Sequence, residues 1–448
     1  MISFLKNAEV MLHIPPLMWH QFSLAMQQSR RDNQEVIGFF FCKHHQIGNQ
    51  VRYYPQAWVV PTPDCYESQS VGGLVLEQQF HLFLLETYVK QGLDIVHVHT
   101  HPGHGKPVFS EIDDDYEAQY AQFLTARFSH QPRLISGILN ESFQQSQFRL
   151  WNATGTSIQP VEFYPTWFTL QSSPSFLGET EQMFARQYIF GSTFQKQLGE
   201  LSVTLIGCGG IGAMFAELLA RLGVKKWVLI DPDYLEISNL NRMPGATWEM
   251  VNQPLHKVEY VKQFIAKIYP THSEIRTLPT PIEKALTQVD CTASDLIVVA
   301  TDNHYSRQIA QELALQSMRP LMSLGTHIEV KSDHFPRMYC RVTVPPLGGG
   351  WCLMCGNIIN LHKAALESAP PEIEYLATQG GYLEDIPDPS VFWLNSICAS
   401  TGVGIIQGML AGFLKMNSGL DWIYEFPESR WHKTDTLSLM APDCYFCS

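Results

Sequence analysis

A glycine-rich loop that directly follows a short apolar run is the feature that most constrains the fold of this chain. The run Val203–Ile206 is typical of a buried strand, and residues 207–212 after it read Gly-Cys-Gly-Gly-Ile-Gly. A helical pattern continues to Leu222, a second strand is expected over Trp227–Ile230, and Asp231 follows that strand. Strand, glycine loop, helix and strand in this order predict a doubly wound parallel sheet with a phosphate site at the start of the helix.

The same loop also occurs in nicotinamide-binding enzymes, where backbone N–H groups hold phosphates and an aspartate binds ribose hydroxyls. Residues further along favour carboxylate activation instead. Attack of a carboxylate on the α-phosphate of ATP requires cations that neutralise the phosphates and a carboxylate that holds Mg²⁺. Arg242, Lys257 and Asp302 have this chemistry, and Asp302 follows a strand expected over Leu296–Ala300. A nicotinamide oxidoreductase has no need of them and is the less favoured alternative.

Length and composition indicate a folded protein of more than one domain. The chain has 448 residues, of which 45% are hydrophobic and 16% charged, an ordinary globular composition. One hydrophobic core rarely serves so long a chain. The stretch with Pro165 and residues 171–175, which read Gln-Ser-Ser-Pro-Ser, is the clearest linker. We therefore expect a domain over residues 1–165, a linker over 166–180 and a second domain over 181–448.

Charge and cysteine usage bear on partners and location. A net charge of −13 argues against nucleic acid or an anionic membrane as the main partner. Charged residues interrupt the start of the chain before any long apolar stretch, so it does not resemble a signal peptide. Ten cysteines without such a signal are typical of reduced thiols and metal ligands. These features predict a cytoplasmic protein.

An uncharged segment from Ser390 to Leu414 is long enough to span a membrane. Gly404, Gly408 and Gly412 have the spacing of a transmembrane dimerisation face. Polar residues such as Asn395, and acidic rather than basic residues before the segment, count against a membrane span. A buried helix packed closely against a sheet explains the glycines equally well, and we expect that structure.

Two histidines near the middle of the first half are arranged as metal ligands. His99 and His101 follow the apolar run Ile95–Val98, which predicts a strand, and side chains two apart on a strand point to one face. Ser110 is suited to an N-cap, which places Asp113 in the first turn of the next helix. Two imidazoles and one carboxylate leave the fourth position of Zn²⁺ for water, which is the arrangement of a catalytic site.

Such chemistry needs a base, and Glu35, just before the apolar run Val36–Cys42, is the candidate. The hydroxyl of Ser110 can donate a hydrogen bond to a tetrahedral oxyanion. Simpler explanations exist for the single elements. Ser110 with Asp113 can be only a helix cap, and His97 on the same strand face shows that histidine here is not confined to the ligands. Together the elements predict a hydrolytic zinc site.

The glutamate, the His-Thr-His-Pro run and the Ser-x-x-Asp motif resemble the JAMM (MPN+) metallopeptidases, over about residues 10–150. Members of that family remove ubiquitin or ubiquitin-like proteins. The resemblance implies an α/β metallopeptidase domain in which His99, His101 and Asp113 hold a catalytic Zn²⁺. It also implies that Glu35 is the base and Ser110 the oxyanion donor. The stretch from His101 to Ser110 is one residue longer than the usual spacing of the family.

The second half resembles the ThiF/MoeB-type adenylating enzymes of the ubiquitin-activating superfamily, from about Met183 to Ser448. The match begins with Arg186-Gln187 and continues through the glycine loop to Thr301-Asp302-Asn303. It implies a doubly wound, Rossmann-like adenylating domain that binds ATP and Mg²⁺ through Gly207, Gly209, Gly210, Gly212, Asp231, Asp233, Ser238, Asn239, Arg242, Lys257, Asp302 and Asn303.

The resemblance also assigns roles. Asp231 would bind the ribose, and Asn239, Arg242 and Lys257 would contact phosphates. Asp302 would hold Mg²⁺. Arg186 would reach into the site of a partner subunit, which implies a homodimer. The family has a buried helix where Ser390–Leu414 lies, and this agrees with the expected soluble fold.

Two Cys-x-x-Cys pairs, Cys352 with Cys355 and Cys444 with Cys447, predict a second, four-thiolate Zn²⁺ site that is closed and structural. A redox pair is the alternative. Many relatives carry a later cysteine that accepts the activated terminus as a thioester, but residues 356–397 contain none. Cys398 is the nearest and is expected to be a packing residue.

These predictions describe a bifunctional enzyme of a ubiquitin-like protein pathway. The first half would trim or release a protein C-terminus, and the second would adenylate it and pass it to a separate conjugating protein. Sulfur-carrier activation, which yields a thiocarboxylate, is an alternative for the second half. A scaffold that binds the ubiquitin-like protein without turnover is the alternative for the first.

Overall fold

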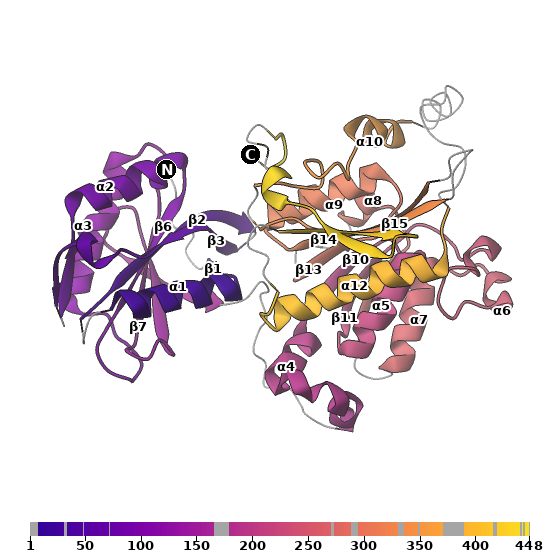
Figure 1. The fold of residues 1–448 in the computed structure, drawn as a ribbon, viewed down its shortest axis with the longest axis horizontal. Coiled ribbons are helices and arrows are strands. Elements are labelled where there is room, and N and C mark those ends of the chain that lie inside the picture. Colours follow the sequence, from indigo (N-terminus) through magenta and orange to yellow (C-terminus); the bar gives the residue numbers. More distant parts are fainter. Residues whose placement is uncertain are drawn as a thin grey trace. The chain divides into compact units, whose positions relative to one another are not determined.

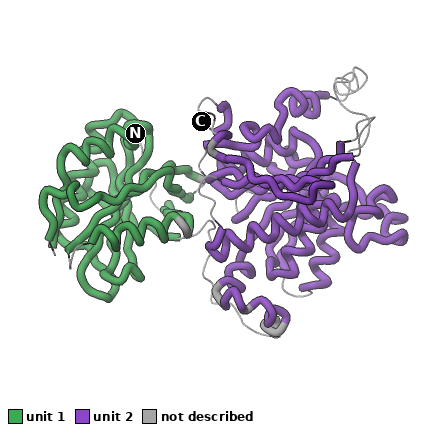
Figure 2. The backbone as a smooth tube through the Cα atoms, viewed as in Figure 1, with its two compact units in different colours: residues 1–167 green, residues 168–448 purple. Residues whose placement is uncertain are grey.

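A computed structural model shows two compact units, residues 1–167 and residues 168–448 (Figure 2). The structure describes residues 8–30, 34–47, 49–70, 72–164, 179–269, 273–287, 294–329, 336–347, 350–370, 389–414, 419–439, 441 and 444–447. Most of the linker expected over 166–180 lies outside the described residues. Each unit is a mixed α/β structure with its own core.

A closed barrel forms the first unit, with strand order β1-β3-β2-β6-β7-β8-β9. The barrel closes because β1 pairs in parallel with both β3 and β9. Its strands are β1 (Glu9–His13), β2 (Ile37–Ile47), β3 (Gln50–Val59), β6 (Asp94–Thr100), β7 (Leu134–Leu139), β8 (Ser146–Trp151) and β9 (Ile158–Tyr164). A separate hairpin consists of β4 (Tyr66–Ser70) and β5 (Gly73–Leu76).

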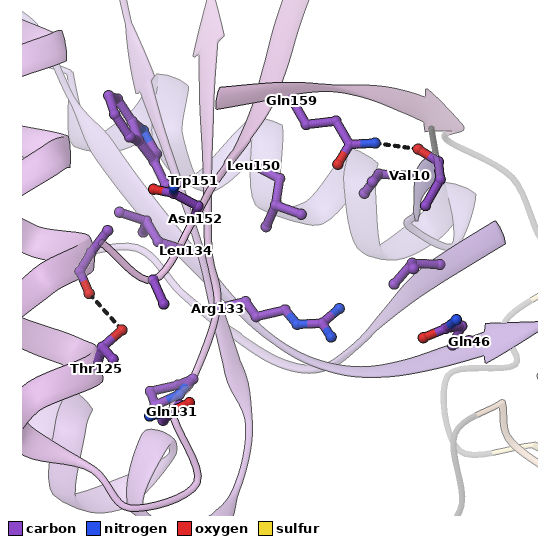
Figure 3. A pocket seen from close by; sticks show the side chains of 15 residues that line it. Val10, Gln46, Thr125, Gln131, Arg133, Leu134, Leu150, Trp151, Asn152 and Gln159 are labelled. Carbon is purple, nitrogen blue, oxygen red and sulfur yellow. Dashed lines mark hydrogen bonds between the residues drawn. The ribbon is translucent and has the colours of Figure 1, made fainter. Parts of the chain in front are cut away.

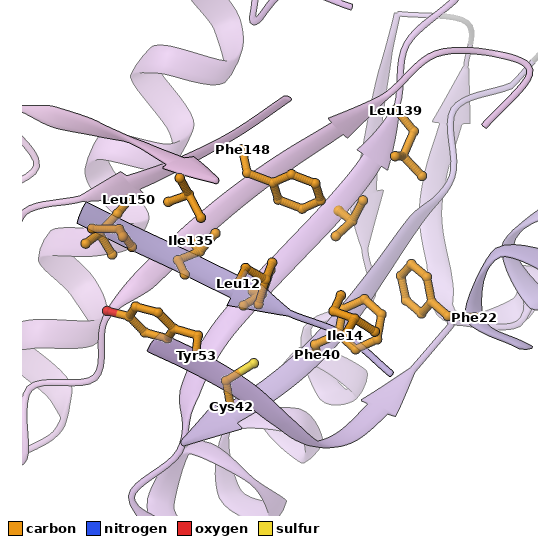
Figure 4. Packing of buried hydrophobic residues seen from close by; sticks show 14 of the residues in the cluster. Leu12, Ile14, Phe22, Phe40, Cys42, Tyr53, Ile135, Leu139, Phe148 and Leu150 are labelled. Atoms are coloured by element: carbon orange, nitrogen blue, oxygen red, sulfur yellow. The ribbon is translucent and has the colours of Figure 1, made fainter. Parts of the chain in front are cut away.

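Helices pack against both faces of these strands. On one face, α1 (Pro16–Ser29) joins a cluster of buried strand residues that point toward a common centre (Figure 4). The ring of Phe22 lies 2.5 Å from where a Cβ of Gly38 would be, so β2 needs glycine at this position. On the other face, α2 (Gln78–Thr87) and α3 (Glu111–Arg127) cover a second buried cluster. Short 3-10 turns occur at η1 (Pro63–Cys65) and η2 (Val89–Gln91).

The second unit is built on one sheet with strand order β12-β11-β10-β13-β14-β15-β16-β17. Pairing from β12 through β14 is parallel, and pairing from β14 through β17 is antiparallel. The strands are β10 (Ser202–Ile206), β11 (Lys226–Ile230), β12 (Glu274–Leu278), β13 (Leu296–Val299), β14 (Leu321–Glu329), β15 (Arg337–Val344), β16 (Leu420–Phe426) and β17 (Arg430–Lys433). The strand order reverses at β10, and this topology places a ligand crevice at the carboxyl end of that strand.

Helices cover both faces of the sheet, with α5, α7 and α12 on one side and α8 and α9 on the other (Figure 1). The helices are α4 (Ser192–Glu200), α5 (Gly210–Leu222), α6 (Trp248–Val251), α7 (Lys257–Ile268), α8 (Ile282–Ala285), α9 (His304–Ser317), α10 (Leu361–Glu367) and α12 (Phe392–Leu410). The 3-10 segments are η3 (Glu179–Phe190), η4 (Ile237–Asn239) and η6 (Thr436–Leu439).

Most of the predicted elements are confirmed, and one is partly wrong. The strands expected over Val203–Ile206, Trp227–Ile230 and Leu296–Ala300 correspond to β10, β11 and β13. The apolar pattern from Leu74 to Tyr88 predicts one helix, but α2 begins only at Gln78, because residues 74–76 pair with β4 instead. The uncharged segment forms α12, whose side chains are buried along much of its length. In the part of the chain that the structure describes, no helix combines the length and apolarity needed to cross a membrane.

Candidate functional site

A cavity of about 850 Å³ opens at the carboxyl ends of β10 and β13. Its lining includes most of the residues that the sequence singled out in the second half of the chain. Those that line it are Gly207, Gly209, Gly210, Asp231, Asp233, Asn239, Arg242, Lys257, Asp302 and Asn303. The volume is in the range of sites that hold a nucleotide-sized ligand.

The glycine loop connects β10 to α5 and places the first turn of that helix at the cavity. Gly207 has a φ of 93°, and a Cβ there would lie 2.8 Å from the backbone of Ala300. A Cβ on Gly210 would lie 2.5 Å from the side-chain amide of Asn395. The loop therefore tolerates no larger residue at these positions, and the N–H groups at the start of α5 provide an anion site.

Asp231 lies at the end of β11 and is only 6% exposed. One carboxylate oxygen accepts a hydrogen bond from the N–H of Cys208 at 2.7 Å, and the other accepts one from the N–H of Asp233 at 2.9 Å. Burial raises the pKa of Asp231, and the nearby Lys257 acts in the opposite direction. The carboxylate is thus held in a fixed orientation with lone pairs left for further donors.

Two cations and two further carboxylates from the predicted set also line the cavity. Lys257, the first residue of α7, donates to the carboxylate of Asp233 at 2.7 Å. The guanidinium of Arg242 donates to the carbonyl of Ser238 at 2.5 Å. Asp302 follows β13 and lines the cavity, as the topology of a parallel sheet requires of a site residue. The arrangement brings positive charge and carboxylates together beside the glycine loop.

Two of the predicted cavity residues have structural roles. Asn303 is the N-cap of α9, and its side chain accepts a hydrogen bond from the N–H of Ser306 at 2.8 Å. Asn239 is 3% exposed and accepts from the N–H of Glu236 at 3.0 Å, which orders the 3-10 turn η4. These hydrogen bonds order the backbone that forms the cavity wall. The need for them explains part of why asparagine occurs at both positions.

Three of the residues predicted for the adenylation site are not among those that line the cavity. A Cβ on Gly212 would lie 1.9 Å from the carbonyl oxygen of Gly207, so Gly212 serves the packing of the loop. Ser238 is exposed, and its hydroxyl donates to Glu236. Arg186 is exposed on η3.

The histidine site of the first unit forms where the end of β6 meets the start of α3. His99 Nε2 lies 3.1 Å from one carboxylate oxygen of Asp113, and His101 Nε2 lies 3.2 Å from the other. The two Nε2 atoms are 3.0 Å apart. Three metal-ligating atoms thus converge with the spacing that a single ion with bonds of about 2.0–2.1 Å imposes. The donor set of two imidazoles and a carboxylate fits Zn²⁺ with an open position.

A capping box fixes Asp113 within this cluster. The hydroxyl of Ser110 accepts from the N–H of Asp113 at 3.2 Å, and Asp113 in turn accepts from the N–H of Ser110 at 2.7 Å. The predicted N-cap at Ser110 is therefore confirmed. The longer stretch before it is anchored by Asn140, whose amide donates to the carbonyl of His104 at 2.9 Å. The extra residue does not displace the carboxylate from the histidines.

Glu35 lies two residues before the start of β2. Ile37 pairs with His99 in the sheet, so Glu35, two residues earlier, lies level with His101. Gln69 holds the backbone there by donating to the Glu35 carbonyl at 2.7 Å. Burial raises the pKa of the Glu35 carboxyl to about 7, and His101 acts in the opposite direction. A glutamate with this pKa beside an open metal position is suited to accept and return a proton near neutral pH.

Residues 184–381 match the ThiF family. They form a ThiF-family domain. The sulfur carrier protein ThiS adenylyltransferase of Bacillus subtilis is 28% identical over 193 residues, which cover 39% of this chain and 54% of that protein. The adenylyltransferase and sulfurtransferase MOCS3 of Sus scrofa is 32% identical over 186 residues, which cover 38% of this chain and 36% of that protein. The chain thus spans about half or less of the length of these curated relatives.

Among solved structures, the crystal structure of E. coli MccB with ATP superposes with a TM-score of 0.46 and 17% sequence identity, over 62% of this chain and 75% of that chain. The match to the ThiF family includes the glycine loop and the cavity residues through Asn303. It also includes the first of the two cysteine pairs.

The four cysteines of the two pairs come together in the second unit. The Sγ atom of Cys352 lies 3.7 Å from those of Cys355 and Cys444, and Cys355 Sγ lies 3.7 Å from Cys447 Sγ. Tetrahedral Zn²⁺ with bonds of about 2.3 Å separates its ligands by about 3.8 Å. The cysteines are free thiols and much of the cluster is buried. Four converging thiolates fit a closed metal site better than a redox pair.

Some cavity residues had no motif to mark them. Thr326 and Asn395 line the cavity, and Thr326 donates to the side-chain carbonyl of Asn395 at 3.3 Å. Asn395 is 1% exposed on α12, where most neighbours are apolar. Its polarity within that uncharged segment was the only signal in the sequence. Arg307 of α9 also lines the cavity and donates to the carbonyl of Thr301 at 2.8 Å.

Proposed function

We propose that the second unit adenylates the C-terminal carboxylate of a ubiquitin-like or sulfur-carrier protein, using ATP and Mg²⁺. The observation that carries this proposal is the cavity in which the glycine loop, Asp231, Arg242, Lys257 and Asp302 line one space. The ThiF-family match over residues 184–381 supports it, since the relatives named above are adenylyltransferases.

Each residue has a role in this reaction. The N–H groups of the glycine loop hold phosphate oxygens, and Asp231 accepts hydrogen bonds from the ribose hydroxyls. Arg242 and Lys257 neutralise charge as a carboxylate oxygen bonds to the α-phosphorus and the bond to the β-phosphate breaks, releasing pyrophosphate. Mg²⁺, held by Asp302, would supply further charge neutralisation. Asp233, Ser238, Asn239 and Asn303 would orient these groups.

A thioester on Cys398 has little support. The Cys398 side chain is fully buried on α12, and its thiol donates to the carbonyls of Gly325 and Arg341 at 3.6 Å. The hydrogen bond with Cys340 and burial raise its pKa well above the usual range. A thiol that stays protonated and inaccessible is a poor nucleophile. The acyl group would therefore pass to a separate conjugating protein or to a sulfur donor.

We further propose that the first unit is a JAMM-type zinc metallopeptidase. Its support is geometric: the ligating atoms of His99, His101 and Asp113 converge, and Glu35 lies two residues before Ile37, which pairs with His99. Zn²⁺ held there would polarise the scissile carbonyl and activate water. Glu35 would take the proton of the attacking water and return it to the leaving amine. Ser110 would donate to the oxyanion.

The two activities would act on one partner in sequence. Trimming of a precursor exposes the carboxylate that adenylation requires, and release from conjugates is the other use of such a peptidase. We propose a cytoplasmic homodimer in which the exposed Arg186 reaches the partner subunit's cavity, and a structural Zn²⁺ on Cys352, Cys355, Cys444 and Cys447. A sulfur-carrier protein is the second candidate for the protein that is adenylated, because the relative from Bacillus subtilis is a sulfur carrier protein adenylyltransferase.

ATP–pyrophosphate exchange and intact mass with candidate ubiquitin-like partners test both halves. The full chain is compared with Asp302→Ala and Glu35→Gln, and each variant is the control for the other. We expect exchange to be lost only with Asp302→Ala, and trimming of a C-terminally extended partner to be lost only with Glu35→Gln. A partner mass that gains sulfur indicates thiocarboxylate formation. Full processing by Glu35→Gln contradicts the peptidase proposal, and exchange that survives Asp302→Ala contradicts the assigned role of Asp302.

A further inference from the structure

Arg149 of β8 lies at the centre of a buried cluster beside the histidine site, and it is 5% exposed. Its Nε and one terminal nitrogen donate to a single carboxylate oxygen of Glu117 at 2.9 and 2.5 Å. Its other terminal nitrogen donates to Asp114 at 2.5 Å. The guanidinium also stacks 3.6 Å from the centroid of the Phe109 ring and 5.0 Å from that of Trp151.

These contacts surround the capping box that carries a metal ligand. Phe109 directly precedes Ser110, and Asp114 directly follows Asp113. Arg149 therefore holds the residues on both sides of the box, from a strand that contributes no ligand itself. Guanidinium groups suit this task because their planar fork binds carboxylates and stacks on aromatic rings at the same time.

Strand β6 and helix α3 contact each other at two successive levels. At the first level, His99 and His101 meet Asp113. At the second, His97 Nε2 lies 3.4 Å from a carboxylate oxygen of Glu117, which is one helical turn after Asp113. Glu117 is 3% exposed and accepts from Trp151 Nε1 at 2.8 Å as well as from Arg149. Hydrogen bonds from Arg149 and Trp151 of β8 therefore hold Glu117 at the second level. At the first level, the side chains of His99, His101 and Asp113 remain as candidate ligands for an ion.

We propose that Arg149 is a positioning residue of the metal site, which sets Zn²⁺ affinity by holding α3 and the loop before it against β6. The proposal rests on the proposed metal-binding function of the first unit. The physical reason is that Asp113, one of the three ligands, lies in the first turn of α3. The residues around this turn are largely exposed, so few other contacts hold it in place. Without the clamp, Asp113 must be ordered at the moment of binding, and that conformational entropy is subtracted from the affinity.

Arg149→Lys in the full chain tests the proposal, because lysine keeps the charge but loses the fork and the stacking. Zn²⁺ affinity is measured by competition with a chromogenic chelator, and Co²⁺ is used as a spectroscopic probe of the ligand geometry. We expect the affinity of the histidine site to fall by about 10- to 100-fold, the range found when groups that orient metal ligands are removed. The cysteine site keeps its metal.

Arg133→Lys is the matched control. Arg133 is a partly buried arginine of the same unit, and its guanidinium donates to Tyr53 at 3.1 Å. Its backbone N–H donates to Asp94, the first residue of β6, so it lies at the strand end opposite the histidines. Figure 3 shows its side chain in a separate pocket lined by Leu134, Leu150 and Gln159. We expect this variant to lower the thermal stability and leave Zn²⁺ affinity unchanged.

A second variant keeps the proposal testable if Arg149→Lys fails to fold. Phe109→Leu removes only the stacked ring and leaves the ion pairs in place, so we expect a smaller fall in affinity in the same direction. Wild-type affinity in both variants, with the histidine site occupied, overturns the positioning role. A wild-type chain that binds Zn²⁺ only at the cysteines overturns the proposed function of the first unit instead, so the two failures are distinguishable.

Discussion

Among the described residues, two clusters could hold a metal ion, and they differ in donor type, donor number and surroundings. The cluster of His99, His101 and Asp113 offers three ligands from one strand and one helix, with Glu35 level with them. The cluster of four cysteines offers four thiols from two loops that are 92 residues apart between Cys352 and Cys444. Three hard or intermediate donors with space for water are typical of a catalytic site, and four thiolates are typical of a structural one.

The clusters also differ in what holds the ligands in place. His99 lies on β6, which pairs on both sides, and His101 directly follows that strand, where its N–H donates to the carbonyl of Leu139 at 2.8 Å. The protein therefore orders both residues without an ion. The cysteines lie on segments with little secondary structure, at Trp351–Cys355 and at the end of the chain. An ion at the histidine site would therefore use a preformed geometry, and an ion at the cysteine site would contribute to folding.

The largest effect is expected from removal of a cysteine ligand. Cys444→Ser leaves a three-thiol site and unties the C-terminal segment, so we expect the free energy of unfolding of the second unit to fall by about 4 kcal/mol or more, the size associated with loss of a structural metal. Denaturant unfolding and zinc content per chain measure it. Cys340→Ser, at a buried cysteine outside the cluster, is the control and should keep its zinc. Unchanged stability in Cys444→Ser means that the cysteine cluster does not hold a structural ion.

The next effect concerns catalysis at the histidine site and leaves stability alone. Glu35→Gln removes the proposed base, and cleavage of a C-terminally extended ubiquitin-like partner should slow by about 10²- to 10⁴-fold. Zinc content should not change, because Glu35 is not a ligand. Glu86→Gln, at an exposed glutamate of α2 paired with Lys90, is the matched control. Loss of zinc from the Glu35 variant would instead make this glutamate a ligand and the site a closed one.

A smaller effect is expected at the helix cap. Ser110→Ala removes the hydroxyl that accepts from the N–H of Asp113, at a cost of about 1 kcal/mol in the stability of the first unit. It also removes the proposed oxyanion donor, so cleavage should slow by about 10²-fold. Ser110→Thr keeps both functions and is the control. A normal cleavage rate in Ser110→Ala, with the expected loss of stability, assigns Ser110 to capping alone.

The smallest effect on stability is expected from mild chelation. A chelator at low concentration should remove the ion from the open histidine site first and leave the cysteine site occupied. The unfolding temperature should change little, because β6 and α3 are held by their own contacts, and adenylation should continue. Metal analysis measures how many ions remain per chain, thermal unfolding measures the stability, and pyrophosphate exchange measures the adenylation activity. Release from the cysteine site first contradicts the assignment of open and closed sites.

Local patterns predicted those parts of the structure in which a few neighbouring residues decide the outcome. The period of two in His99-Thr100-His101 placed both imidazoles on one strand face, and Ser110 was identified as a cap from its residue type and position. The glycine loop was predicted because only glycine has the backbone freedom and the small size that Gly207 and Gly210 need. Residues 74–76 were misassigned because their apolar pattern is shared by strands and helices, and the partner strand β4 decided between them.

Residues that act through distant partners had no pattern to reveal them. Arg149 contacts Glu117 across 32 positions of the chain, and Asn395 meets Thr326 across 69. A buried arginine and a buried asparagine are uncommon, but their residue types alone do not say that they are buried. Only the packing of β8 on α3, and of α12 against the cavity, gives these polar groups their partners.

By itself, the sequence determined which chemical groups the chain carries: a glycine loop, two imidazoles with a carboxylate, and four thiols. These depend on residue type and on spacings within one turn or one strand, where the backbone geometry leaves few alternatives. The tertiary structure decided the closure of the barrel through β1, which no motif predicted. It also decided the clamp at Arg149. Such contacts join segments far apart in the chain, and their stability comes from burial and from partners that no local pattern specifies.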